Sequence, residues 1–261
     1  MLTRILIIGD SQVESALKTH GFGSILNDRF NGEADVILRK FPGYTAEWIK
    51  LLTSSVARNL GATPDYIIIL CGRDDCLRSK QDTRPVTDPE KFRKNLYSLV
   101  DKITNEVDMN AERFILLSPL PIHTMRFEGD EGNVFDGVTI DKSTIKQYTE
   151  KTKEVATRVG GQFVDTSALL DRALDANFRQ GGIKLSNDGH LNLAEKLVEL
   201  IELTESPFPS FDTIGNDYVK TLGEINQNCS LVQEDNIAAY TYVSTVDQYS
   251  AYLGKTYRGK V

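Results

Sequence analysis

A serine and a histidine stand near opposite ends of the first 200 residues, each in a polar turn. Gly9-Asp10-Ser11 follows the apolar run from Ile5 to Ile8, and Asn187-Asp188-Gly189-His190 precedes a segment with helical spacing. A serine hydroxyl can attack a carbonyl carbon when an imidazole takes its proton. The two residue types therefore indicate nucleophilic catalysis, although Ser11 alone is also explained as an ordinary helix cap.

The elements that must position these residues alternate between strands and helices through residue 203. The expected strands are 5–8, 35–38, 66–71, 114–118 and 162–164, and the expected helices are 13–30, 45–60, 88–107, 141–159 and 192–203. Several of the strand runs are apolar throughout, which is typical of parallel strands covered on both faces. The pattern predicts a doubly wound α/β domain over residues 1–203 with its ligand site at the carboxyl ends of the strands.

Two further polar segments follow expected strands. Gly43-Tyr44-Thr45-Ala46-Glu47-Trp48 comes after the second strand, and Gly72-Arg73-Asp74-Asp75 comes after the third. Together with the segments around Ser11 and His190, this ordered set resembles the GDSL, or SGNH, hydrolases, and especially the isoamyl-acetate-hydrolysing esterase branch. The resemblance implies a flavodoxin-like three-layer α/β/α fold with a five-stranded parallel sheet, in the strand order 2-1-3-4-5.

The resemblance also implies roles for individual residues. Ser11 matches the nucleophile that forms an acyl-enzyme, and His190 matches the general base. The backbone N–H groups of Ser11 and Gly43 match donors of the oxyanion hole, and Asp74 occupies the third donor position. The implied activity is hydrolysis of small acyl or acetyl esters, with no cofactor and no metal.

Two positions depart from the family pattern. Asp74 stands where an asparagine is expected, and an ionised carboxylate has no N–H to donate to an oxyanion. Asn187 stands where an aspartate is expected, and an asparagine there can favour the wrong imidazole tautomer. We expect Asp188 to orient the imidazole instead, because Gly189 gives the loop the freedom to turn its neighbour inward.

The sequence leaves two functions open. The first is a serine esterase acting on small esters. The second is a catalytically impaired protein of the same fold, which acts as a structural or binding subunit of a larger assembly. Two other histidines are weaker candidates for the site: His20 falls inside an expected helix, and His123 follows an expected strand and can line a pocket.

Charge and composition exclude several other classes of function. The formal net charge of the 261 residues is −7, which disfavours general binding to nucleic acid or to anionic membranes. Three cysteines are too few for a disulfide framework, and no signal peptide or membrane span is recognised. We therefore expect a cytoplasmic or other reducing intracellular location. Residues 204–261 form a Tyr-rich extension, which we expect to dock on the domain or on a protein partner.

Overall fold

The computed structural model describes residues 2–30, 33–79, 85–123, 138–140 and 142–201. The chain divides into two units, residues 1–206 and residues 207–261, and the described residues all belong to the first. The extension predicted over 204–261 lies outside the described residues, so its docking stays a prediction.

Five parallel strands form the central sheet in the order β2-β1-β3-β5-β7. These strands are β1 (Thr3–Gly9), β2 (Ala34–Lys40), β3 (Tyr66–Leu70), β5 (Phe114–Leu117) and β7 (Gln162–Val164). Numbered within the sheet, this is the predicted order 2-1-3-4-5, which is confirmed. A separate antiparallel pair joins β4 (Arg78–Ser79) to β6 (Val138–Thr139).

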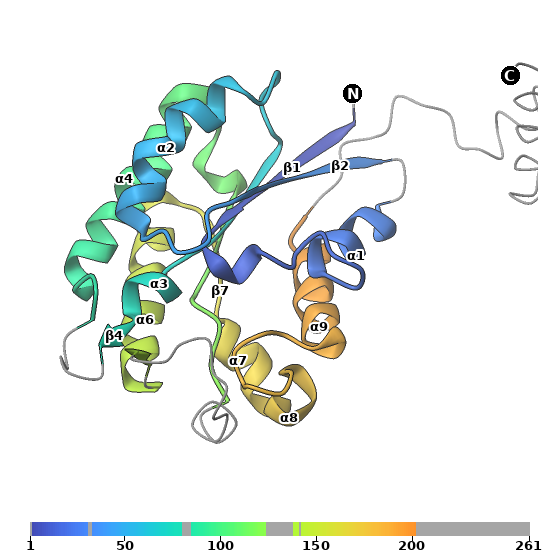
Figure 1. Cartoon of the computed structure of the whole chain (residues 1–261). Coiled ribbons are helices and arrows are strands. Elements are labelled where there is room, and N and C mark those ends of the chain that lie inside the picture. The colour runs from blue at the N-terminus through green and yellow to red at the C-terminus, as the bar shows by residue number, and fades with distance from the viewer. Residues whose placement is uncertain (1, 31–32, 80–84, 124–137, 141, 202–261) are drawn as a thin grey trace, which may run out of the picture. The chain divides into compact units, whose positions relative to one another are not determined.

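Helices cover both faces of the sheet (Figure 1). One face carries α2 (Ala46–Arg58), α4 (Pro89–Val107) and α6 (Lys142–Val159), and the other carries α1 (Phe22–Arg29) and α9 (Asn187–Val198). Successive side chains of a strand point to opposite faces. Accordingly, Leu6 and Ile8 of β1 pack in the first layer, whereas Ile5 and Ile7 pack in the second. Burial on both faces explains why β3 and β5 are apolar throughout.

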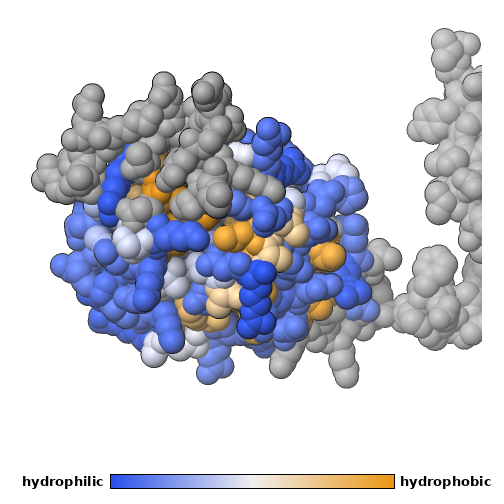
Figure 2. Space-filling model, turned by 90° about the horizontal axis from the view of Figure 1, so that it is seen from below, coloured by the Kyte–Doolittle hydropathy of each residue, from blue (hydrophilic) through white to orange (hydrophobic). Residues whose placement is uncertain are grey.

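Shorter elements complete the described domain. They are η1 (Ser11–Val13), α3 (Arg73–Cys76), η2 (Ala111–Arg113), α7 (Thr166–Leu170), η3 (Asp171–Ala173) and α8 (Leu174–Asn177). The face seen in Figure 2 is hydrophilic over most of its described residues, with a narrower hydrophobic area near its centre. In the part of the chain that the structure describes, no helix is both long and apolar enough to cross a membrane.

The helix predicted over residues 13–30 is wrong in its first half. Only α1, from Phe22, is an α-helix there, and turns connect it to η1. His20 adopts a left-handed conformation with φ of 61°, which interrupts a right-handed helix. A Cβ added to Gly21 would lie 2.1 Å from the carbonyl oxygen of Ser15, so the chain can double back closely at this glycine.

The last helix of the domain begins earlier than predicted. The sequence places its start at Asn192, whereas α9 begins at Asn187. Ser186 is the N-cap, because its hydroxyl accepts a hydrogen bond from the backbone N–H of Gly189. His190 therefore lies in the first turns of a helix and not in a loop before it.

Candidate active site

Ser11 begins η1, separated by one residue from the carboxyl end of β1, which is the second strand in the order of the sheet. A Cβ added to Gly9 would lie 2.1 Å from the carbonyl oxygen of Leu70, so only glycine fits between β1 and β3 at this point. Asp10 caps the short helix by accepting a hydrogen bond from the N–H of Gln12 at 3.0 Å. The Gly-Asp-Ser turn thus fixes the position of the Ser11 hydroxyl relative to the carboxyl end of β1.

Asp10 also fixes the loop after β3. Its Oδ2 accepts hydrogen bonds from the backbone N–H groups of Gly72 and Arg73, both at 2.9 Å. The carboxyl group is completely buried. Burial, reinforced by the nearby charge of Asp74, raises the pKa of Asp10 to about 7, although hydrogen bonds from Gln12 act in the opposite direction. Asp10 is therefore a positioning residue that ties the turn of Ser11 to the turn of Asp74.

The carboxylate of Asp74 accepts three hydrogen bonds from the predicted site residues. Its Oδ2 accepts from the backbone N–H of Gly43 at 3.0 Å and from that of Ser11 at 3.3 Å. Its Oδ1 accepts from the Ser11 hydroxyl at 3.1 Å. Gly43 turns its N–H inward from a left-handed conformation with φ of 80°. Ser11, Gly43 and Asp74 therefore come together, with a carboxylate oxygen where two backbone donors converge.

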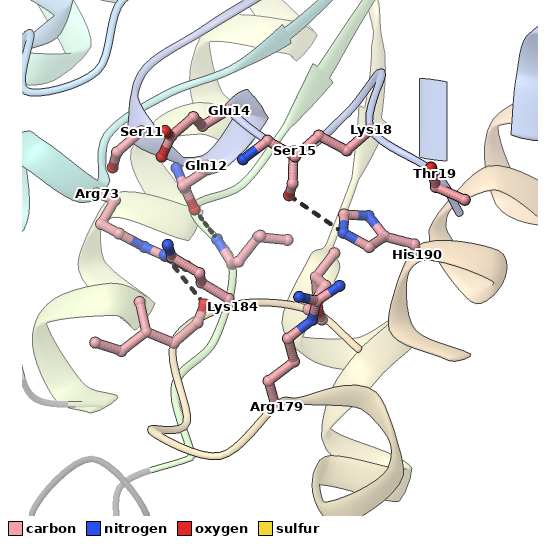
Figure 3. Close-up of a pocket in the computed structure, with 13 residues that line it drawn as sticks. Ser11, Gln12, Glu14, Ser15, Lys18, Thr19, Arg73, Arg179, Lys184 and His190 are labelled. Carbon is pink, nitrogen blue, oxygen red and sulfur yellow. Dashed lines mark hydrogen bonds between the residues drawn. The ribbon is translucent and has the colours of Figure 1, made fainter. Parts of the chain in front are cut away.

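The structure pairs His190 with Ser15 and not with Ser11. The distance from His190 Nε2 to Ser15 Oγ is 3.2 Å, and the backbone N–H of Phe22 donates to His190 Nδ1 at 3.3 Å (Figure 3). Because Nδ1 accepts a hydrogen bond, the proton of the neutral ring must be on Nε2, which then donates to Ser15. In this arrangement His190 has no free basic nitrogen for the proton of Ser11.

Burial disfavours the charged form of His190. Only 2% of the residue is exposed. Burial, with a further contribution from the positive charge of Arg179, lowers the pKa of His190 to about 4. The ring is therefore neutral at pH 7, and it packs against the ring of Phe22 with 6.0 Å between ring centroids.

Asp188, which the sequence predicts to orient the imidazole, forms no hydrogen bond with His190 among the described residues. Asp188 is exposed in the first turn of α9. The nitrogen that an orienting carboxylate would bind, His190 Nδ1, already accepts from Phe22. The physical reason for the difference is the early start of α9, since residues two apart on a helix, such as Asp188 and His190, point to different sides of it.

A pocket of about 90 Å³ opens between Ser11 and His190. Several of its lining side chains are basic, and sequence reasoning did not assign them to the site (Figure 3): Lys18, Arg73, Arg179 and Lys184. The available sequence signal was the concentration of Arg179 and Lys184 just before α9, in a loop that turns at Gly181 and Gly182, where φ is 92° and 67°.

Neither of the other two histidines adds a catalytic group to the pocket. His123 contacts the exposed carboxylate of Asp175 at 2.9 Å, and His20 is an exposed turn residue. Among the described residues, no group of three or more His, Cys, Asp or Glu side chains is arranged to hold a metal ion.

The parallel sheet and its Gly-Asp-Ser turn define an SGNH-type hydrolase fold. The chain belongs to the GDSL-like lipase/acylhydrolase family, whose model matches residues 7–193. The human protein named isoamyl acetate-hydrolyzing esterase 1 homolog is 28% identical over 211 residues, which cover 79% of this chain and 84% of that protein. Its mouse counterpart is 26% identical over 212 residues, with the same coverage.

Solved structures agree on the fold. The lipase/acylhydrolase from Enterococcus faecalis superposes with a TM-score of 0.59 at 18% identity, covering 78% of this chain and all of that one. The acetyl xylan esterase AlAXEase gives a TM-score of 0.57 at 16% identity, covering 76% of this chain and all of that one. The predicted fold and family are thus confirmed.

Proposed function

We propose that this protein is a serine esterase for small acyl esters, with Ser11 as its nucleophile, and that Asp74 keeps its turnover low. The observation that carries the proposal is the convergence of the Ser11 and Gly43 N–H groups on one oxygen atom of Asp74. Two backbone donors aimed at one point beside a serine hydroxyl are what the oxyanion of a tetrahedral intermediate requires. The relatives named as isoamyl acetate-hydrolyzing esterase homologs support the choice of ester hydrolysis.

In this mechanism the carbonyl oxygen of the ester takes the place of Asp74 Oδ2. Ser11 Oγ then attacks the carbonyl carbon while its proton passes to Asp74, and that proton goes on to the leaving oxygen, which departs as the alcohol. Water then hydrolyses the acyl-enzyme, which releases the acid and restores the Ser11 hydroxyl. The acceptor that contacts the Ser11 hydroxyl is Asp74, and carboxylates are weaker bases than imidazole. Two features therefore slow the reaction: the oxyanion donors are already engaged, and the proton acceptor is weak.

A fluorophosphonate probe tests this assignment, because it forms a covalent bond with an activated serine. We expect mass spectrometry to find the label on the peptide containing Ser11, with faster labelling of Asp74→Asn. Ser15→Ala is the matched control, since Ser15 lines the same pocket and its loss leaves Ser11 in place. Absence of label from Ser11 in both the wild type and Asp74→Asn contradicts the proposal.

The second candidate is a non-hydrolytic binding or structural subunit. It is favoured by one specific observation: the Ser11 hydroxyl donates to a carboxylate, while His190 is engaged by Ser15 and Phe22. In that case residues 204–261 are the segment that the sequence suggests for contact with a partner. Co-purification of a partner by the full chain, but not by a chain lacking 204–261, together with an unlabelled Ser11, supports this second function.

A further inference from the structure

Arg73 is a buried cation in the pocket beside Ser11. Only 4% of the residue is exposed, and its Nη1 donates to the carbonyl oxygen of Ile183 at 3.1 Å. Its Nε and Nη2 atoms are buried without a hydrogen-bond partner among the described residues. A buried donor without a partner destabilises the folded protein, and a charged one does so more strongly. A buried, unpartnered guanidinium group in a folded protein therefore calls for an explanation, and one explanation is a ligand that accepts its hydrogen bonds.

The carboxylates near Arg73 do not supply the missing hydrogen bonds. Their charges favour its ionised form, whereas burial lowers the pKa of Arg73. Asp10 accepts from the side chain of Gln12 and from backbone N–H groups, including that of Arg73 itself. Asp74 accepts from Ser11 and Gly43. Two guanidinium nitrogens of Arg73 therefore have no acceptor among the described residues, although Arg73 lines the pocket.

Further cations stand at the rim of the same pocket. Arg179 and Lys184 line it and are exposed, and Figure 3 shows Arg179 below His190 and Arg73 below Ser11. The Nε of Arg179 donates to the carbonyl oxygen of Leu185, and neither side chain forms an ion pair within the described residues. Lys18 is the fourth basic residue that lines the pocket, whereas Glu14 is the one acidic residue among the lining residues. A concave site with such an excess of positive charge attracts anions.

The size of the pocket suits a small group. Its volume is about 90 Å³, whereas roughly 10–15 Å³ on the same kind of measure holds one water molecule. A carboxylate or a phosphate group occupies the space of a few waters, and the planar fork of an arginine binds either group with two hydrogen bonds.

We propose that this pocket binds an oxyanion group, carboxylate or phosphate, with Arg73 as its buried anchor and Arg179 and Lys184 at its rim. For an esterase, the site selects acidic esters over neutral ones of the same size. This selectivity rests on the proposed function, whereas binding of the anion does not.

Calorimetric titration of the full chain with inorganic phosphate and, separately, with succinate tests the binding. We expect at least one of the two anions to bind, and the better one identifies the preferred group. The variant Arg179→Gln/Lys184→Gln should weaken binding at least about tenfold, which corresponds to about 1.4 kcal/mol, because it removes two cationic hydrogen-bond donors. Arg73→Gln should weaken binding as much or more if it folds. Arg179 and Lys184 are both exposed, so the double variant at the rim does not depend on that condition.

Two controls separate charge in the pocket from charge in general. Lys94→Gln removes one exposed positive charge from α4, which does not line the pocket, and should leave the affinity unchanged within twofold. Ser11→Ala should still bind the anion, which separates this site from the proposed nucleophile. The proposal is overturned if neither anion binds up to about 10 mM, well above a Kd of 1 mM. It is equally overturned if the rim variant binds as tightly as Lys94→Gln.

A pair of esters then tests selectivity. 4-Acetoxybenzoate and 4-acetoxybenzamide are acetate esters that differ only in a carboxylate against a neutral amide of similar size, and neither group can reach the ester bond. We expect kcat/KM of Asp74→Asn to be at least about tenfold higher for the acid, and the preference to disappear in Arg179→Gln/Lys184→Gln. If anions bind but neither ester is hydrolysed, the proposed function fails and the anion site stands. If both esters react equally, the selectivity fails and the esterase stands.

Discussion

The hydroxyl of Ser11 donates a hydrogen bond to the carboxylate of Asp74 across 3.1 Å. The same carboxylate accepts the N–H of Ser11, so one aspartate engages both the nucleophilic atom and an oxyanion donor of the same residue. An ester and the Asp74 carboxylate cannot occupy these donors together. Asp74 is therefore the residue whose replacement tells most about the site.

Asp74→Asn should increase kcat for short acyl esters at least about tenfold. An asparagine of almost the same size offers an N–H to the oxyanion, and one such donor contributes roughly 10²–10³ in rate. Loss of the weak base offsets part of this gain, which is why only about tenfold is expected. Hydrolysis of 4-nitrophenyl acetate, followed at 405 nm, measures the change.

The matched control for this substitution is Asp101→Asn, because Asp101 is exposed on α4 and the net charge changes equally. It should leave kcat unchanged. A fall in activity of Asp74→Asn below that of the wild type contradicts the inhibitory role and identifies the carboxylate as an essential base.

Asp188→Ala and Asn187→Ala should both leave hydrolysis within about twofold of the parent protein. Both residues are exposed at the start of α9, and His190 Nδ1 accepts from Phe22 and not from a carboxylate. Surface substitutions of this kind usually change stability by no more than about 0.5 kcal/mol. Steady-state kinetics in the Asp74→Asn background, where turnover is easiest to measure, checks this. A large loss for Asp188→Ala alone restores the orienting role predicted from the sequence.

The sequence predicted the sheet better than the site, and the reason is physical. Strands buried on both faces leave long apolar runs such as Tyr66 to Leu70, which are recognisable without their neighbours. The position of His190 depended instead on one cap, because Ser186 starts α9 five residues earlier than periodicity suggested. Arg73, Arg179 and Lys184 meet only after folding, and basic residues in loops carry no local pattern that distinguishes a pocket from a solvated surface.

Gly9→Ala should destabilise the domain by about 1–3 kcal/mol, the usual cost of overpacking. The added methyl would lie 2.1 Å from the Leu70 carbonyl oxygen and 2.6 Å from Val13 Cγ1, so backbone must move. Urea unfolding measures the change in the free energy of unfolding. Gly61→Ala is the comparison: its Cβ meets nothing within 4 Å, and only its positive φ of 72° is strained. A Gly9→Ala protein as stable as Gly61→Ala contradicts the predicted close contact.

Deletion of residues 204–261 should either lower the melting temperature or abolish binding to a partner, as the sequence suggests for a docked extension. Thermal unfolding and size-exclusion chromatography of the full and truncated chains compare the two proteins. An unchanged melting temperature with an unchanged set of binding partners contradicts docking of the extension.

Replacing His190 should change how stability depends on pH. The folded pKa of about 4 lies below the value of about 6.5 expected for histidine in the unfolded chain. Between these values the unfolded state binds more protons, so His190 lowers the free energy of unfolding as the pH falls. The effect is absent above about pH 6.5 and reaches about 3 kcal/mol near pH 4, at 1.36 kcal/mol for each unit of pKa.

The comparison of wild type with His190→Asn isolates this effect. Burial raises the pKa of Asp10 to about 7 and of Asp75 to about 6, which gives the opposite slope, but both residues are present in both proteins. An asparagine oxygen can still accept the N–H of Phe22 and cannot be protonated in this range. Urea unfolding from pH 4 to pH 7 should therefore show the wild type losing stability relative to the variant as the pH falls. Nitrogen-15 spectra of the wild type should show a neutral ring with its proton on Nε2. A ring that titrates near pH 6.5, or carries its proton on Nδ1, contradicts the hydrogen bond from Phe22 and returns His190 to candidacy as the base for Ser11.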